Sequence, residues 1–111
     1  MYSRRTFFAS AAAVSVAATS ANAQDACSVF TSVRQKATTP AQAIELLKAG
    51  NERFISGKLI NCDPMVQVRS TATGQSPFAV IVGCIDSRVP PELVFDRNIG
   101  DIFAARVAGN L

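Results

Sequence analysis

Three residues with chemically useful side chains stand two positions apart in the stretch Cys84-Ile85-Asp86-Ser87-Arg88. The thiolate of Cys84 is a soft ligand of the kind that suits zinc. The carboxylate of Asp86 can bind a metal ion or accept hydrogen bonds, and the planar guanidinium of Arg88 can hold a carboxylate through two parallel hydrogen bonds. The spacing therefore predicts that Arg88 decides which of these two roles Asp86 plays.

Each of these residues also has an ordinary structural interpretation. A single cysteine after a buried strand is usually a small core residue. An aspartate and an arginine two residues apart usually form a loop ion pair that contributes little to stability. Taken one at a time, these residues do not establish a function.

The elements around this stretch predict where it lies in a fold. Residues 78–83 form a short apolar run rich in β-branched side chains after Pro77, a pattern typical of a strand that is buried on both faces in a parallel sheet. Residues 90–95 predict a short helix that begins with proline, and residues 102–107 predict a second buried strand. We therefore expect an α/β fold, a parallel β-sheet core with flanking helices, with Cys84 at the carboxyl end of a strand, where such folds build sites.

The upstream region predicts helices with less regular connections. Thr39 and Pro40 have the residue types of an N-cap and a first helical position, so we expect a helix from there to about Ile55, ended by Gly57. The recurrence of apolar residues over 27–33 predicts a short helix. Residues 61–74 are rich in turn-forming residues, and an extended excursion over a partner's surface is one interpretation of them.

The first 23 residues have the order of an export signal. Ser3-Arg4-Arg5-Thr6-Phe7-Phe8 is similar to the twin-arginine export motif, and an alanine-rich apolar segment (9–18) and Ala21-Asn22-Ala23, an A-x-A cleavage pattern, follow it. The alternative is an amphipathic or buried N-terminal helix. We expect residues 1–23 to be a signal peptide, residues 24–111 to be the mature domain, and the protein to be periplasmic or secreted.

Composition excludes several classes of function. The chain of 111 residues has no histidine, which excludes histidine-based catalysis within it. Removal of residues 1–23, which contain two arginines and no acidic residue, leaves 88 residues with a net charge of +1. This charge leaves no basic patch for nucleic acid, and no apolar run is long enough for a stable membrane span after the signal is removed.

The residues around Cys84 closely resemble the β-class carbonic anhydrases. The resemblance runs from Gly74 to Glu92, includes the Cys-x-Asp-Ser-Arg core, and continues at the family's spacing in residues 50–54, 100–103 and 106–110. It covers roughly residues 40–111, which would correspond to the N-terminal half of a family domain.

The resemblance implies a chemistry and a set of roles. The family hydrates carbon dioxide reversibly to bicarbonate and a proton, and it holds Zn²⁺ with two cysteines and one histidine. Cys84 would be the first thiolate ligand, and Asp86 would be the carboxylate that takes the fourth zinc position unless Arg88 holds it away.

Two further site residues follow from the resemblance alone. Gln75 matches a glutamine that donates a hydrogen bond to bicarbonate in the partner subunit's pocket, which implies a homodimer or a higher homo-oligomer; by itself it would be taken for an exposed turn residue. Phe103 matches an apolar wall of the substrate pocket, and ordinary core packing is an equally compatible role. Asp101 and Arg106 are expected to orient loops near the site.

The sequence also departs from the family pattern. The family's remaining ligands, His-x-x-Cys, would come downstream of Asn110, and Val107 replaces a usual asparagine. Because zinc normally needs at least three protein ligands, we expect this chain alone to bind zinc weakly and to hydrate carbon dioxide negligibly. Of the three cysteines, Cys27 and Cys62 are the pair whose disulfide would leave Cys84 free.

Three other interpretations remain open at this point. The first is a non-catalytic remnant of the family that keeps the dimer-forming segment. The second is a related enzyme that uses zinc hydroxide on another substrate, such as a carbon disulfide hydrolase. A thiol-redox role for Cys84 is the third, although the sequence has no Cys-x-x-Cys motif.

Overall fold

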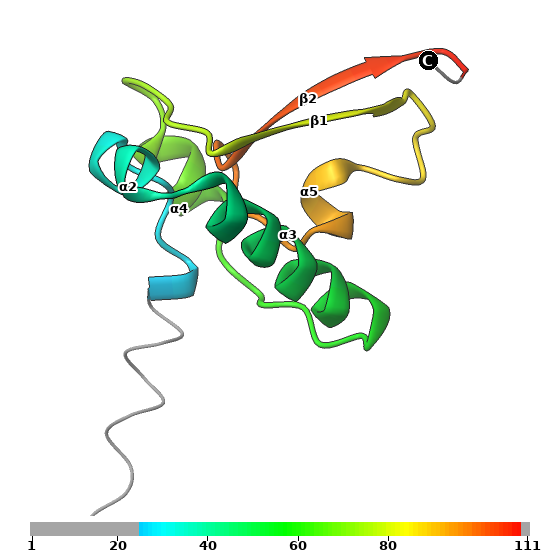
Figure 1. Ribbon diagram of the computed structural model, residues 1–111, viewed down its shortest axis with the longest axis horizontal. Helices are drawn as coiled ribbons and strands as arrows, with labels where there is room; N and C mark the ends of the chain where they lie inside the picture. The colour runs from blue at the N-terminus through cyan, green and yellow to red at the C-terminus, as the bar shows by residue number, and fades with distance from the viewer. Residues whose placement is uncertain (1–24, 110–111) are drawn as a thin grey trace, which may run out of the picture.

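The computed structural model describes residues 25–109, and the predicted signal peptide lies outside these residues. The described part contains four helices and two strands, arranged as the α/β fold that the sequence predicts (Figure 1). In chain order they are α2 (Ser32–Ala37), α3 (Pro40–Ile55), α4 (Pro64–Ser70), β1 (Ala79–Cys84), α5 (Pro91–Val94) and β2 (Ile102–Val107).

Helix α3 begins and ends where its sequence signals predict. The Thr39 hydroxyl accepts a hydrogen bond from the Gln42 amide, and the Gln42 side chain accepts one from the Thr39 amide, which makes a capping box. Pro40 occupies the first helical position, where its missing N–H costs nothing. Gly57 follows the helix with a φ of 68°, a conformation that glycine adopts without strain.

Two expectations for the upstream region are wrong. The short helix does not span 27–33: α2 begins at Ser32, because Thr31 accepts the Arg34 amide as its N-cap. Part of the turn-rich stretch 61–74 is helical, because Asp63 caps α4 and Pro64 starts it.

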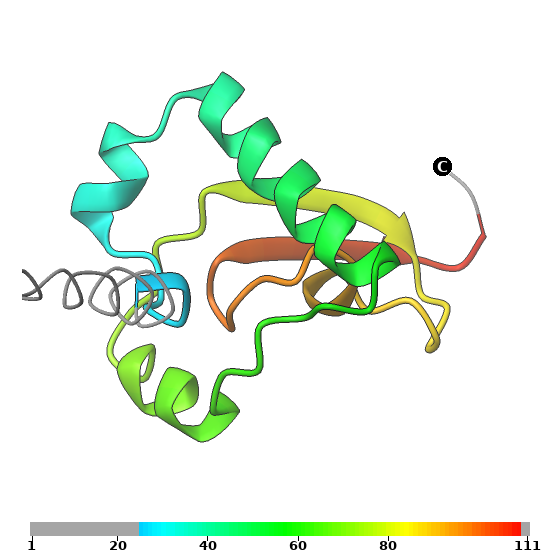
Figure 2. The same cartoon turned by 90° about the horizontal axis from the view of Figure 1, so that it is seen from below.

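The sheet consists of β1 and β2, which pair in parallel. Val80 lies opposite Phe103, Val82 opposite Ala105, and Cys84 opposite Val107. In both views the helices lie on one side of this sheet, with α3 crossing it and α5 beside the strands (Figures 1 and 2). The predicted strands and the short helix between them are therefore present within a residue or two of their expected bounds.

The opposite face of the sheet is open within the described residues. The side chains that point to this face from the two strands are exposed, with exposed fractions of 58% for Val80, 55% for Val82, 50% for Phe103 and 46% for Val107. The expectation that both strands are buried on both faces is therefore wrong for this part of the chain, because helices cover only one side of the sheet.

The buried interior between the N-terminal segment and β2 is small and partly polar. Phe30 and Ile102 are the large apolar side chains buried there, beside the polar residues Gln67, Asn98 and Asp101. Every buried side-chain polar atom in the described residues has a hydrogen-bond partner. A polar network of this kind specifies how the segments meet.

Helix α3 approaches α5 closely at Gly50. A Cβ atom at this position would lie 1.7 Å from the backbone oxygen of Phe95, so only glycine fits. The Asn51 side chain donates to the Val94 carbonyl (3.1 Å), and Arg53 forms an ion pair with Asp96. These contacts fix the end of α5 and the residues that follow it against α3. Among residues 25–109, every helix is too short or too polar to span a bilayer.

Candidate site at the carboxyl end of strand β1

Cys84 is the last residue of β1, and its thiol is exposed and not in a disulfide. Strand alternation turns it to the open face of the sheet, beside Val107 of β2. Its position at the carboxyl end of a parallel strand agrees with the place predicted for chemistry. The other two cysteines, Cys27 and Cys62, form a disulfide, as expected for the pairing that leaves Cys84 free.

Arg88 holds Asp86 at both carboxylate oxygens. The Arg88 Nε donates to Asp86 Oδ1 (2.9 Å), its Nη2 donates to Oδ2 (2.6 Å), and the Arg88 backbone N–H also donates to Oδ1 (3.0 Å). The Arg88 side-chain bonds, followed by this backbone bond, lower the pKa of Asp86 from 3.8 to about 2. Asp86 is therefore ionised at neutral pH, and its oxygens face a guanidinium.

Arg106 of β2 braces the loop that carries these residues. Its Nε donates to the Cys84 carbonyl (2.8 Å), and its Nη2 donates to the carbonyls of Asp86 and Val89. It lies opposite Gly83 in the strand register, so its side chain is at the right height to reach across to the loop. The loop-orienting role expected for Arg106 is present in the structure.

A small cavity of about 260 Å³ lies under this loop. Its wall combines Cys84 and Asp86 with apolar residues of β1, the loop and α5: Ile81, Gly83, Val89, Pro91, Val94 and Phe95. Asp86 and Cys84 thus border a mostly apolar space that would hold a small molecule, Cys84 from the end of the strand, because strand alternation places its side chain on the other face of the sheet from Ile81 and Gly83.

Gln75 and Phe103 lie away from Cys84 within this chain. Gln75 is exposed and precedes β1, and Phe103 is near the start of β2, opposite Val80. A six-residue strand is about 17 Å long, so both residues are near the far end of the sheet from Cys84. The role of Gln75 in a partner's pocket and that of Phe103 as a pocket wall stay predictions.

The described residues do not by themselves form a zinc site. They contain no group of three His, Cys, Asp or Glu side chains close enough to hold a metal ion. Both oxygens of Asp86 are engaged by Arg88, so the site offers one uncommitted soft ligand, the Cys84 thiol. A protein zinc site normally needs at least three ligands, so these residues do not fit the ion without further donors.

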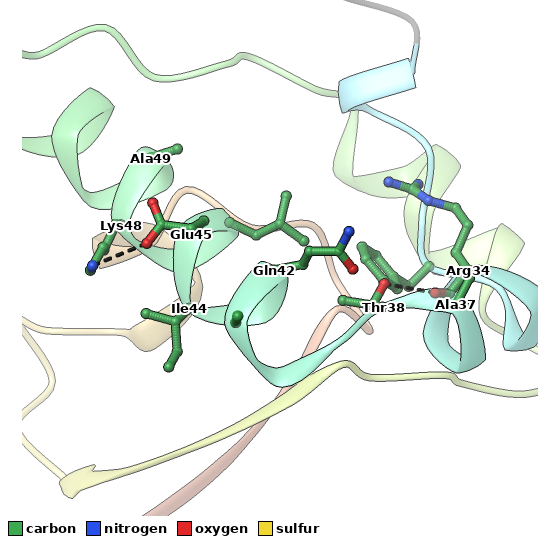
Figure 3. A pocket seen from close by; sticks show the side chains of 11 residues that line it. Arg34, Ala37, Thr38, Gln42, Ile44, Glu45, Lys48 and Ala49 are labelled. Carbon is green, nitrogen blue, oxygen red and sulfur yellow. Dashed lines mark hydrogen bonds and ion pairs between the residues drawn. The ribbon is translucent and has the colours of Figure 1, made fainter.

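A larger groove of about 860 Å³ lies between α2 and α3 (Figure 3). It is apolar along Ala37, Ile44 and Ala49, and Lys48 and Glu45 form an ion pair on its rim. It contains none of the residues predicted to do chemistry, and nothing in the sequence singled it out.

Comparison with known proteins supports the carbonic anhydrase resemblance. A family model described as carbonic anhydrase matches residues 79–111, which include the Cys84 site. The curated protein "Carbonic anhydrase 2" of Mycobacterium tuberculosis is 47% identical over 75 residues, which are 67% of this chain and 36% of that protein. "Carbonic anhydrase" of Mycolicibacterium smegmatis is 40% identical over the same shares of the two chains, and that of Pseudomonas aeruginosa is 49% identical over 43 residues (39% of this chain, 20% of that protein).

These matches, with the parallel β-α-β unit and the Cys-x-Asp-Ser-Arg loop, define the class of protein. The chain belongs to the carbonic anhydrase family, as the sequence predicts. It spans about a third of the length of the curated relatives that match it over 75 residues.

Proposed function

We propose that this protein serves the reversible hydration of carbon dioxide to bicarbonate and a proton, the activity for which its relatives are named. The observation that carries the proposal is the bidentate hydrogen bonding of Arg88 to Asp86, two residues after the exposed Cys84 at the carboxyl end of a parallel strand. The small, largely apolar cavity under the loop suits a small apolar substrate such as carbon dioxide.

The residues of this chain would contribute position and charge to that reaction. Arg88 engages both carboxylate oxygens of the ionised Asp86, and Arg106 holds the loop backbone that carries both residues. We propose Cys84 as one ligand of the zinc ion on which the family generally depends. The other donors would come from outside the described residues, since these residues supply no three-donor group.

The remaining roles concern a second copy of the chain. We propose that the protein works as a homodimer or higher homo-oligomer, in which Gln75 donates a hydrogen bond to bicarbonate in the partner's pocket and Phe103 lines the pocket wall. The distance of Gln75 from Cys84 along the sheet supports a role in a second subunit rather than in its own.

A non-catalytic function is the second candidate. The observation that favours it is the incomplete donor set around Cys84 among the described residues. A chain of this kind would keep the ability to associate without the ability to hydrate carbon dioxide.

A chimera separates these two candidates. The matched 75-residue segment of the Mycobacterium tuberculosis protein would be replaced by that of this chain, and carbon dioxide hydration would be followed by stopped-flow with a pH indicator, with the 111-residue chain measured alone in parallel. We expect zinc-dependent hydration by the chimera and negligible hydration by the 111-residue chain. A folded chimera that binds zinc and gives no hydration would refute the catalytic proposal.

Two variants in the chimera test the residue roles. Cys84→Ser should abolish zinc-dependent hydration, because it removes a ligand. Arg88→Ala should lower the rate about 10- to 100-fold, the usual effect of removing a group that orients a ligand. Arg69→Ala, which removes an exposed guanidinium from α4, is the matched control and should leave the rate unchanged.

We also propose export of the protein, directed by residues 1–23, to the periplasm or the exterior. The Cys27–Cys62 disulfide supports this proposal, because disulfides persist mainly in oxidising compartments. Cell fractionation with N-terminal sequencing tests it: we expect a mature form that starts after Ala23, and a full-length cytoplasmic form would contradict the proposal.

A further inference from the structure

A covalent link fastens the N-terminal segment of the described chain. The Cys27–Cys62 disulfide joins this segment to the loop between α3 and α4, 35 residues further along the chain. We call residues 25–38, which include α2, the strap. Both cysteines are partly exposed, so a small reductant can reach the bond.

The strap lies against the residues that lead into β2. The Phe30 amide donates to the buried carboxylate of Asp101 (3.1 Å). The Asn98 side-chain amide donates to the carbonyls of Ala26 (2.9 Å) and Ser28 (3.2 Å). Asn98 and Asp101 come just before β2, so the strap contacts the start of that strand.

The strap also touches the residues that lead into β1. The Gln35 side chain donates to the carbonyl of Pro77 (2.5 Å), a buried residue two positions before the strand. The ring of Phe30 lies 4.6 Å from that of Phe78. The strap therefore contacts the residues before both strands, at the end of the sheet that lies nearest to Gln75 in the sequence.

These contacts alone hold the strap weakly. Helix α2 has six residues and buries none of them, and Val33 on it is 76% exposed. A helix this short does not persist in water without packing. Phe30 is the single large apolar side chain that anchors the strap, so the covalent link carries much of its attachment.

We propose that the Cys27–Cys62 disulfide is a redox-sensitive lock on the strap. A dithiol reductant gives two electrons and two protons to the bond, so that both cysteines become thiols and the dithiol becomes a disulfide. The strap then leaves the starts of β1 and β2, while α3 and its contacts to α5 persist, because Arg53, Asn51 and Gly50 hold them independently of the strap. This inference does not depend on the proposed activity.

Hydrogen exchange of the full 111-residue chain tests the lock, measured by mass spectrometry with and without dithiothreitol. The reporter is the Phe30 amide, which is bonded to Asp101 in the oxidised protein. We expect exchange in the strap to accelerate about tenfold or more on reduction, and exchange at the end of α3 to change less than about twofold. Unchanged exchange in the strap, or an equal loss of protection throughout the chain, would overturn the proposal.

Two variants check the assignment. Cys84→Ser should leave the response to dithiothreitol unchanged, which excludes an effect of the free thiol. The double variant Cys27→Ser with Cys62→Ser should show the fast-exchanging strap without reductant and no further response to it. If the double variant does not fold, the comparison of oxidised and reduced wild-type protein still decides the question.

Discussion

Asn98 links three segments of the protein, and its removal should be costly. The side chain is 7% exposed. Its Oδ1 accepts a hydrogen bond from Gln67 Nε2 (2.7 Å), and its Nδ2 donates to two carbonyls of the strap. Asn98→Ala therefore removes three hydrogen bonds that join α4 and the strap to the start of β2, while the Gln67 bond to the Ile99 amide and the Phe30 bond to Asp101 remain.

The size of the effect follows from which groups lose a partner. Gln67 is 6% exposed, so its side-chain amide would be left buried without an acceptor, at a cost of about 1–3 kcal/mol. The strap carbonyls are nearer the surface and can turn to water, so they add only about 1 kcal/mol. We expect Asn98→Ala to lower the free energy of unfolding by roughly 2–4 kcal/mol.

Urea titration followed by far-ultraviolet circular dichroism measures this change, since the chain has no tryptophan and its single tyrosine is Tyr2. Asn61→Ala, the same change at an exposed position, is the control and should stay within about 0.5 kcal/mol of wild type. In the double variant Gln67→Ala with Asn98→Ala, neither side-chain amide of this pair is left without its partner, and the Ile99 amide loses Gln67 Oε1 just as it does in Gln67→Ala alone. The cost of the double variant should therefore be less than the sum of the single costs. A cost for Asn98→Ala within the range of the control, or strict additivity in the double variant, would refute the reasoning.

Three other predictions concern pH and packing. Arg88→Ala should raise the pKa of Asp86 from about 2 towards 3.8, and an NMR titration of the carboxyl carbon measures this change. In the wild-type protein the pKa is lowered by folding, so the ion pair is fully present above pH 3.8 and is lost as the pH falls through about 2. Burial raises the pKa of Asp101, so the folded protein binds the proton more tightly than the unfolded chain, and stability should fall as pH rises from 3.8 through the raised value. Asp101→Asn should remove this pH dependence from urea midpoints measured across that range. Gly50→Ala should destabilise the protein by about 1–3 kcal/mol or more in the same urea titration, because the new methyl group overlaps the Phe95 carbonyl.

Each of these has a clear contrary result. An Asp86 pKa near 2 in the Arg88→Ala variant would show that the guanidinium is not the cause of the shift. An unchanged pH dependence in Asp101→Asn would assign that dependence to another group. Gly74→Ala is the control for Gly50, since a Cβ there meets no atom within 4 Å, and equal effects of the two substitutions would contradict the packing argument.

Local signals in the sequence predicted the elements that local chemistry fixes. Thr39 and Pro40 start α3 because a cap and a proline act within one helical turn. The same signal, Asp63 followed by Pro64, starts α4 and would have identified it within the turn-rich stretch. The two apolar runs became β1 and β2 because short β-branched segments favour strands.

The contacts of the candidate site also differ in whether the sequence alone predicts them. The bond between Arg88 and Asp86 follows from a spacing of two residues in one loop, so the sequence predicted it. The brace from Arg106 joins residues about twenty positions apart, and only the register of the two strands brings it to that loop.

By itself, the sequence determined the strands, the capped helix and the chemistry of the Cys-x-Asp-Ser-Arg loop, because these depend on neighbours within a few residues. Only the tertiary structure decided that Asn98 and Asp101 hold the strap, that Gly50 meets the end of α5, and that one face of the sheet is open among residues 25–109. Those features depend on contacts between segments far apart in the chain, and the burial of one segment is set by whether another packs against it.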